Sequence, residues 1–219
     1  MKLSEDTREV LKNFSQINPN LLVKGGSKIA TMSAMKNIVA LSNVSDNFSQ
    51  EFAIYDLNEF LSALSLFKEP DLSFSNDSVK LKEQNGNSSL NYYFSDPTIV
   101  TAPKTEITMP SVAVEFVLTE SIFAQIQKAA AVLNVPDLVL KGAQGSDINL
   151  LITDRKNTSS NDFSIKVGEN AESDFAYNFK VENLKLLSGD YDVKVSDKGI
   201  SNFKHKKKDI EYFIALESN

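Results

Sequence analysis

The two halves of the sequence repeat one order of elements, and this repeat restricts the possible folds more than any other feature. Leu21–Gly25 reads Leu-Leu-Val-Lys-Gly, and Leu138–Gly142 reads Leu-Val-Leu-Lys-Gly. Each segment follows a stretch whose apolar residues recur at helical spacing, over 4–17 in the first half and 119–133 in the second. Because the order of elements agrees as well as the letters, we interpret the halves as a duplication that adopts one fold twice.

A second pair of matching segments extends the repeat. Glu51–Tyr55 is typical of a strand and runs into a helical pattern over 56–67, while Phe175–Phe179 runs into a shorter helical pattern over 180–187. Three short strands follow each of these helices, over 71–75, 79–83 and 90–94, and over 191–196, 200–204 and 210–216. The sequence therefore predicts an α+β fold of two similar domains, each with two helices packed on antiparallel sheet.

The segment between the halves has the composition of a connector. Ser95–Pro110 contains three of the six prolines and has no amphipathic pattern. We therefore predict an N-terminal domain over 1–94, an interdomain connector over 95–110 and a C-terminal domain over 111–219.

The composition removes most of the common kinds of enzyme site. The 219 residues include no cysteine, no tryptophan and one histidine, His205. Thiol nucleophiles and cysteine zinc sites are thereby excluded, and a Ser-His-Asp triad would have to use His205. The glycine pairs match no nucleotide-binding fingerprint, and the aspartates form no calcium loop. We expect a protein that is not an enzyme, with no catalytic residue, metal or cofactor. A carboxylate-based hydrolase is kept as an alternative, although no carboxylate pair is marked by its context.

The formal net charge of −6 argues against a simple nucleic-acid binder, which is usually basic. Two of the predicted helices, over 56–67 and 119–133, nevertheless have polar faces that are poor in acidic residues, whereas the face of the helix over 4–17 carries Glu5 and Glu9. Such faces can lie near a polyanion, with weak attraction from Arg8, Lys12, Lys128 and Lys185. No apolar stretch is long enough for a membrane span, and Met1–Leu11 lacks the apolar core of a signal peptide. We expect a cytosolic protein with no membrane partner.

A basic run lies between the last two predicted strands. Lys204–Lys208 reads Lys-His-Lys-Lys-Lys, and we place it at a hairpin tip. Two interpretations stay open. The run contacts phosphates, or it is a solvated turn that keeps strands from pairing edge to edge.

Short segments spread over the whole chain form a pattern beyond the repeat: Met1–Thr7, Leu11–Phe14, Ile17-Asn18, Ala53–Asn58, Phe60-Leu61, Asp96-Pro97, Val100, Ala102-Pro103, Gly189–Tyr191 and Tyr212–Glu217. Together these segments resemble the DNA polymerase sliding clamps, specifically the clamps of T-even-type phages. Asp154–Ser173 matches nothing in that family, and the family's usual tail beyond the last strand is nearly absent.

The resemblance implies a ring-forming homotrimer with two clamp-like domains in each subunit. Helices would line a hole around duplex DNA of any sequence, and sheets would form the outer wall. The ring would tether a replicative DNA polymerase for processive synthesis, and an ATP-driven clamp loader would open it. A phage-encoded clamp would act in the host cell cytoplasm. The alternative is a repeated β-rich virion or tail structural protein that does not slide on DNA.

The helix faces and the resemblance together predict three sets of site residues. The DNA-facing set is Arg8, Lys12, Lys128 and Lys185, with Lys36, Lys68 and Lys204–Lys208 as additions. The family's head-to-tail order brings 90–94 of one subunit to 163–167 of the next, through Tyr92, Phe94, Phe163 and Ile165. The apolar pocket for polymerase and loader peptides, beside the connector, is expected to comprise Met35, Ile38, Ile99, Val100, Phe213, Ala215 and Leu216.

Overall fold

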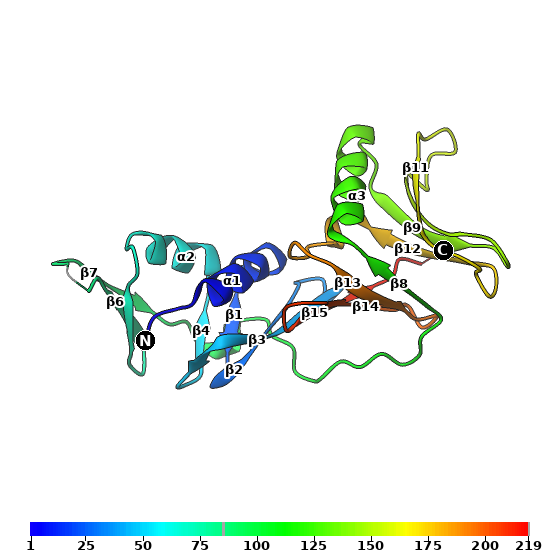
Figure 1. The fold of residues 1–219 in the computed structure, drawn as a ribbon. Helices are drawn as coiled ribbons and strands as arrows, with labels where there is room; N and C mark the ends of the chain where they lie inside the picture. Colours follow the sequence, from blue (N-terminus) through cyan, green and yellow to red (C-terminus); the bar gives the residue numbers. More distant parts are fainter. Residues whose placement is uncertain (85, 219) are drawn as a thin grey trace. The chain divides into compact units, whose positions relative to one another are not determined.

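The chain divides into two units, Met1–Glu106 and Ile107 onward, and the division falls inside the predicted connector. The computed structural model describes residues 1–84 and 86–218; Asn219, the last residue of the predicted C-terminal domain, lies outside the described residues. Each unit places α-helix on antiparallel sheet (Figure 1), which is the predicted fold class. No α-helix in the described part of the chain has the length and apolarity needed to span a membrane.

In the first unit, α1 (Glu5–Ile17) packs on strands of the order β4-β1-β2-β3. Ser4 caps this helix, because its hydroxyl accepts a hydrogen bond from the Thr7 amide at 3.1 Å. The buried apolar residues of α1 recur every three or four positions, as predicted: Val10, Leu11, Phe14 and Ile17. The four strands are β1 (Leu21–Val23), β2 (Gly26–Met32), β3 (Ile38–Phe48) and β4 (Phe52–Ile54).

The second helix of this unit, α2 (Leu57–Ser65), begins at a side-chain cap, Asp56. The Asp56 carboxylate accepts hydrogen bonds from the Asn58 and Glu59 amides at 2.9 and 3.1 Å. α2 lies against α1 and contacts the last strand of a three-stranded sheet of order β5-β6-β7. The strands of this sheet are β5 (Asp71–Phe74), β6 (Ser78–Lys82) and β7 (Ser89–Tyr93).

In the second unit, α3 (Glu120–Leu133) packs on a sheet of order β11-β10-β9-β12. Four further strands have the order β15-β14-β13-β8. α3 ends at Asn134, whose left-handed φ of 53° suits a residue that terminates a helix. The strands are β8 (Val114–Leu118), β9 (Asp137–Gly142), β10 (Ile148–Thr153), β11 (Phe163–Gly168), β12 (Phe175–Lys180), β13 (Tyr191–Val195), β14 (Ile200–His205) and β15 (Ile210–Ala215).

The prediction of a helix over 180–187 is wrong. This stretch forms only a short 3-10 helix, η2 (Val181–Asn183), so the described part of the second unit has one α-helix where the repeat predicts two. Lys180 supplies no side-chain cap, unlike Asp56 at α2.

Two buried tyrosines bind the backbone groups of Leu187, the last residue of the predicted helix. The Tyr212 hydroxyl accepts a hydrogen bond from the Leu187 amide at 3.2 Å, and the Tyr191 hydroxyl donates one to the Leu187 carbonyl at 2.7 Å. Buried backbone groups need partners, and here the sheet supplies them in place of a helical turn.

The start of the predicted connector is attached to the first unit. It contains a 3-10 helix, η1 (Pro97–Ile99). The Asn18 side-chain amide donates a hydrogen bond to the Thr101 carbonyl at 3.3 Å, and the Asn20 side-chain oxygen accepts one from the Thr101 amide at 3.3 Å. These two hydrogen bonds hold the Thr101 backbone of the connector against the segment that precedes β1.

Candidate nucleic-acid interface, subunit edges and connector groove

Arg8 and Lys12 lie on one face of α1 and border a groove between α1 and α2. The groove has a volume of about 440 Å³. The residues that line it, and define the α1–α2 groove, are Arg8, Lys12, Ser15, Asn58, Leu61, Ser62, Leu64 and Ser65. Two of these described residues are cations and none is acidic. In a chain with a formal net charge of −6, this lining makes the groove locally positive.

Among the described residues, no carboxylate lies within ion-pair distance of the cations of this groove, although Glu5 and Glu9 belong to the same helix. Within residues 1–84 and 86–218, neither Arg8 nor Lys12 forms an ion pair, and neither does Lys128 on α3. The Nε atom of Arg8 is buried and has no hydrogen-bond partner among the described residues. Both charges are therefore free to act on an anion that enters the groove.

The serine hydroxyls of the groove are already engaged as donors. Ser15, Ser62 and Ser65 each donate to a carbonyl of their own helix, at 2.9, 2.8 and 2.7 Å. Because the hydroxyl protons are already used, the hydrogen-bond donors that remain for a ligand in the groove come mainly from Arg8 and Lys12. The serines contribute small, polar side chains to the wall of the groove.

The other predicted DNA-facing residues occupy different settings. Lys128 is exposed on α3, whereas Lys185 is half-buried in the loop after η2 and is not on a helix. Lys36 lies in the β2–β3 turn with a φ of 59°, and Lys68 is exposed just after α2. The structure thus brings Arg8 and Lys12 together, and a role in DNA contact stays a prediction for all of these residues.

His205 is not at the hairpin tip where the sequence places it. It is the last residue of β14 and is 6 % exposed. Its Nδ1 accepts hydrogen bonds from the Lys207 and Lys208 amides, both at 3.0 Å, so its Nε2 carries the proton and donates to the Ser188 carbonyl at 3.1 Å. A Cβ atom at Gly189 would lie 2.2 Å from this Nε2. The histidine is therefore a structural residue that shapes the turn, while the basic lysines around it remain at the surface.

The strand β7 ends its sheet and contains Tyr92, one of the predicted interface residues of the first unit, while Phe94 follows directly after the strand. The Tyr92 ring packs edge-on against Phe60 with centroids 5.1 Å apart, and its hydroxyl donates to the Asp56 carbonyl at 3.2 Å. Burial, together with the nearby charges of Glu59 and Asp56, raises the pKa of Tyr92 to about 12. Phe94 stacks on Phe52 at 4.9 Å. Both side chains are half-buried against their own unit.

The strand β11 ends the β11-β10-β9-β12 sheet of the second unit. Phe163 and Ile165 are half-buried, and they alternate with the exposed Ser164 and Lys166. The predicted subunit contacts therefore fall on two terminal strands, one in each unit, and both strands pair with a neighbour on one side.

The predicted peptide-pocket residues are unevenly exposed. Met35 and Ile99 are 84 and 58 % exposed, whereas Ile38 and Phe213 are 2 and 6 % exposed and belong to the core. Val100, Ala215 and Leu216 are half-buried.

A separate groove lies beneath the connector and involves none of the predicted pocket residues. Its volume is about 360 Å³. The residues that line it, and define the connector groove, are Leu22, Lys24, Gly25, Lys28, Ala30, Leu41 and Ala102–Glu106. Ala30 and Leu41 oppose one another on β2 and β3, and the Lys28 ammonium pairs with the Glu106 carboxylate at 2.9 Å. The sequence alone does not indicate this groove, because Lys104 comes near Lys24 and Lys28 only when the connector folds back over β1 and β2.

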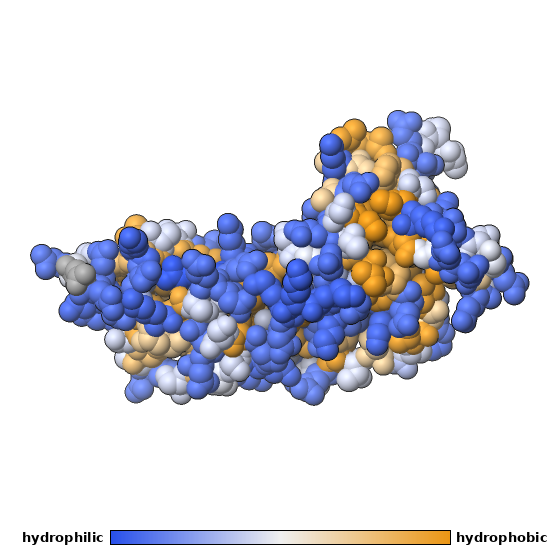
Figure 2. Space-filling view, viewed as in Figure 1, coloured by the Kyte–Doolittle hydropathy of each residue, from blue (hydrophilic) through white to orange (hydrophobic). Residues whose placement is uncertain are grey.

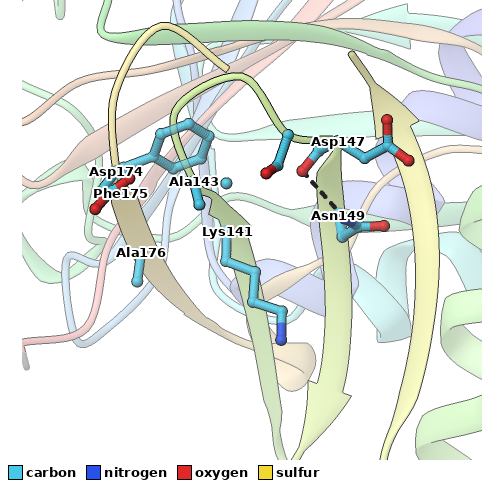
Figure 3. A pocket seen from close by; sticks show the side chains of 9 residues that line it. Lys141, Ala143, Asp147, Asn149, Asp174, Phe175 and Ala176 are labelled. Carbon is cyan, nitrogen blue, oxygen red and sulfur yellow. Dashed lines mark hydrogen bonds between the residues drawn. The ribbon is translucent and has the colours of Figure 1, made fainter. Parts of the chain in front are cut away.

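A hollow of about 640 Å³ lies at the turn between β9 and β10 (Figure 3). Both carboxylates in its lining are engaged: Asp147 pairs with Lys166 at 2.9 Å, and the Asp174 carboxylate accepts a hydrogen bond from the Gln144 backbone amide at 2.9 Å. The described residues contain no group of three or more histidine or acidic side chains arranged to hold a metal ion. This hollow offers no set of converging catalytic groups.

Two family descriptions match this chain, one in each half. Residues 4–101 match the family described as DNA polymerase processivity factor, and residues 115–218 match the one described as gp45 sliding clamp, C terminal. The sliding clamp of Vibrio phage KVP40 is 35 % identical over 223 residues, and the match covers both chains completely. The sliding clamp of Enterobacteria phage T4 is 27 % identical, covering 100 % of this chain and 98 % of that protein. The alternative of a virion or tail structural protein has no support in these matches.

Solved structures show the same fold. A PCNA from A. fulgidus, described with the C-terminal region of FEN-1 bound, aligns with a TM-score of 0.70 and 10 % identity over 97 % of this chain and 95 % of that one. The Caulobacter crescentus pol III beta aligns with a TM-score of 0.69 and 12 % identity over 100 % of this chain and 66 % of that one. With the phage relatives matched over their full length, these comparisons show that the chain belongs to the sliding clamp family of DNA polymerase processivity factors.

Proposed function

We propose that three copies of this chain close head to tail into a ring around duplex DNA and hold a replicative DNA polymerase on its template. One observation carries the closure: each unit ends a sheet in a different strand, β7 in the first and β11 in the second. A ring of identical subunits needs two different, complementary surfaces on every copy. Pairing β7 of one subunit with β11 of the next supplies them and removes two exposed sheet edges.

Contact with DNA in this ring is weak and independent of sequence. Arg8, Lys12, Lys128 and Lys185 form the DNA-facing set. A few cations on a chain with net charge −6 give little affinity, but a closed ring is retained on the duplex by topology and must slide. Phosphate contacts suit this task because they read no bases.

The ring has no catalytic step of its own, and an ATP-driven clamp loader opens and closes it. As a phage-type clamp, the protein acts in the host cell cytoplasm. These statements extend the family membership.

Loading on circular DNA tests the proposal. With its clamp loader, ATP and nicked circular duplex, the protein is expected to elute with the DNA in gel filtration, and cutting the circle with a restriction enzyme is expected to release it. A matched sample without ATP is the control. Equal elution with circular and linear DNA would contradict encirclement, and a monomer in native mass spectrometry would contradict the ring.

Peptide tails of the polymerase and the loader dock beside the connector. The connector groove supports this, since Leu22, Ala30 and Leu41 give it an apolar floor, and Lys24 and Lys104 are cations at its rim, where Lys28 is paired with Glu106. An extended peptide with apolar and acidic residues fits that lining. The contribution of Met35, Ile38, Ile99, Val100, Phe213, Ala215 and Leu216 stays a prediction.

Two substitutions separate the alternatives for this peptide. Leu41→Asp is expected to weaken binding of a fluorescent polymerase-tail peptide at least about tenfold if the connector groove holds it, because a charge then replaces an apolar contact. Val100→Asp has that effect if the peptide lies at the predicted residues. Val117→Asp, at an exposed position of β8, is the matched control. Unchanged peptide binding by both variants, with intact trimers, would place the site elsewhere.

A further inference from the structure

The two units differ in the helical surface that they offer to DNA. The first unit places α1 beside α2, which creates the α1–α2 groove. In the described part of the second unit, α3 has only the short 3-10 helix η2 in place of a second α-helix. The sequence repeat therefore does not extend to this surface.

The α1–α2 groove has the features of a phosphate site. Its cations Arg8 and Lys12 are four residues apart, so they project from consecutive turns of one helix face. The buried Nε atom of Arg8 has no partner among the described residues, and neither cation is held by an ion pair there. Turning the Arg8 side chain toward an anion thus breaks no existing bond, and a guanidinium is well shaped to bind phosphate oxygens.

The helix face of the second unit lacks these features. The exposed residues of α3 include one cation, Lys128, one acid, Glu120, and otherwise uncharged side chains: Ser121, Ala124, Gln125, Gln127, Ala131 and Val132. Figure 2 shows orange surface at the upper end of α3, next to blue and white surface. Lys185 is half-buried and already takes part in an interaction within the chain, which reduces what it can offer to a phosphate.

We infer that the first unit of each subunit carries most of the contact with the DNA backbone, through Arg8 and Lys12 in the α1–α2 groove. The ring then offers the duplex three sites with two cations each, which alternate with three helix faces that carry a single cation. This inference rests on the proposed function and refines it: the sixfold repetition of domains is reduced to threefold symmetry in how DNA is held.

The test compares two double variants that each remove two positive charges. The trimers of Arg8→Gln/Lys12→Gln and Lys128→Gln/Lys185→Gln are titrated with a fluorescein-labelled 30-base-pair duplex at several NaCl concentrations, and anisotropy gives the affinity. Lys80→Gln/Lys82→Gln, on β6, controls for the change in net charge. Native mass and thermal unfolding are measured for every variant, and Lys12→Gln alone serves if the Arg8 substitution disturbs α1–α2 packing.

We expect the first variant to bind at least about tenfold more weakly and to lower the salt slope by about 2 for each subunit that contacts the backbone, and so by up to about 5 for the trimer, because each lost phosphate contact reduces the slope by about 0.9. The second variant should change the slope by less than about 1 per subunit, the value of one contact. Equal losses from both pairs would overturn this inference and leave the proposed function standing. No loss from either pair, in intact trimers, would contradict the DNA-facing set as a whole.

Discussion

Replacing Asn91 by proline is expected to convert the trimer into folded monomers. Asn91 lies in β7, the last strand of its sheet. The Phe94 amide donates to the Asp77 carbonyl at 2.8 Å, toward the β6 side. Because successive residues of a strand bond to opposite sides, the amide of Asn91, three residues earlier, points to the free side of β7. Proline removes that outward donor and leaves the bonds to β6 in place.

The loss should be large, since an edge that cannot accept a new strand loses continuous pairing rather than one contact. Native mass spectrometry and sedimentation measure the state of assembly, and circular dichroism checks that the monomer is folded. Asn91→Ala is the matched control, because it removes the side chain but keeps the backbone N–H group. This variant should remain trimeric. A folded Asn91→Pro trimer of unchanged stability would show that β7 is not the joining edge.

Asp137→Ala is expected to lower the free energy of unfolding by about 3 kcal/mol, as breaking a buried ion pair leaves its partner uncompensated. The Asp137 side chain is 2 % exposed at the start of β9. It forms an ion pair with Lys180 at the end of β12, and it accepts a hydrogen bond from the Arg155 amide at 2.9 Å. The carboxylate thus holds β12 and the loop after β10 to the same strand end. Urea unfolding monitored by circular dichroism measures the loss.

The contribution of Asp137 should also depend on pH in one direction. Burial by itself would raise the pKa of this carboxyl, but hydrogen bonds from Lys180 and the Arg155 amide, and the charges of both side chains, hold its pKa below the ordinary value. A lowered folded-state pKa gives stability that is complete above the unfolded value, about 3.9, and is lost as the pH falls through the folded one. Asp137→Asn keeps the shape without the charge, so its deficit against the unmodified protein should shrink at acid pH. A deficit that stays constant from pH 7 to pH 3 would contradict this role.

Local patterns in the sequence were enough to predict the helices α1, α2 and α3 and most of the strands. Val10, Phe14 and Ile17 have the spacing of a buried helix stripe, and Ser4 and Asp56 are caps that act through bonds within three residues. These patterns can be recognised in the sequence because the residues that interact, a cap and the amide it binds or two residues one helical turn apart, lie close together along the chain. They also supported the resemblance to sliding clamps, which the family comparisons confirm.

The errors have a common physical cause, which is competition from distant partners. The helix predicted over 180–187 is replaced by backbone bonds to Tyr191 and Tyr212, which lie on two strands of a sheet. His205 follows the inward alternation of Phe203, but the lysines beside it made the run resemble an exposed tip.

Periodicity, caps and the internal repeat therefore determined the two-unit α+β fold from sequence alone, because these effects act between near neighbours. Only the tertiary structure decided that β7 and β11 end their sheets, that Arg8 and Lys12 share a groove with α2, and that Asp137 meets Lys180, 43 residues away. Each of these three features depends on which strands or helices, distant in the sequence, become neighbours in the fold. Burial of apolar surface stabilises such neighbours, but it leaves no local pattern in the sequence that identifies them.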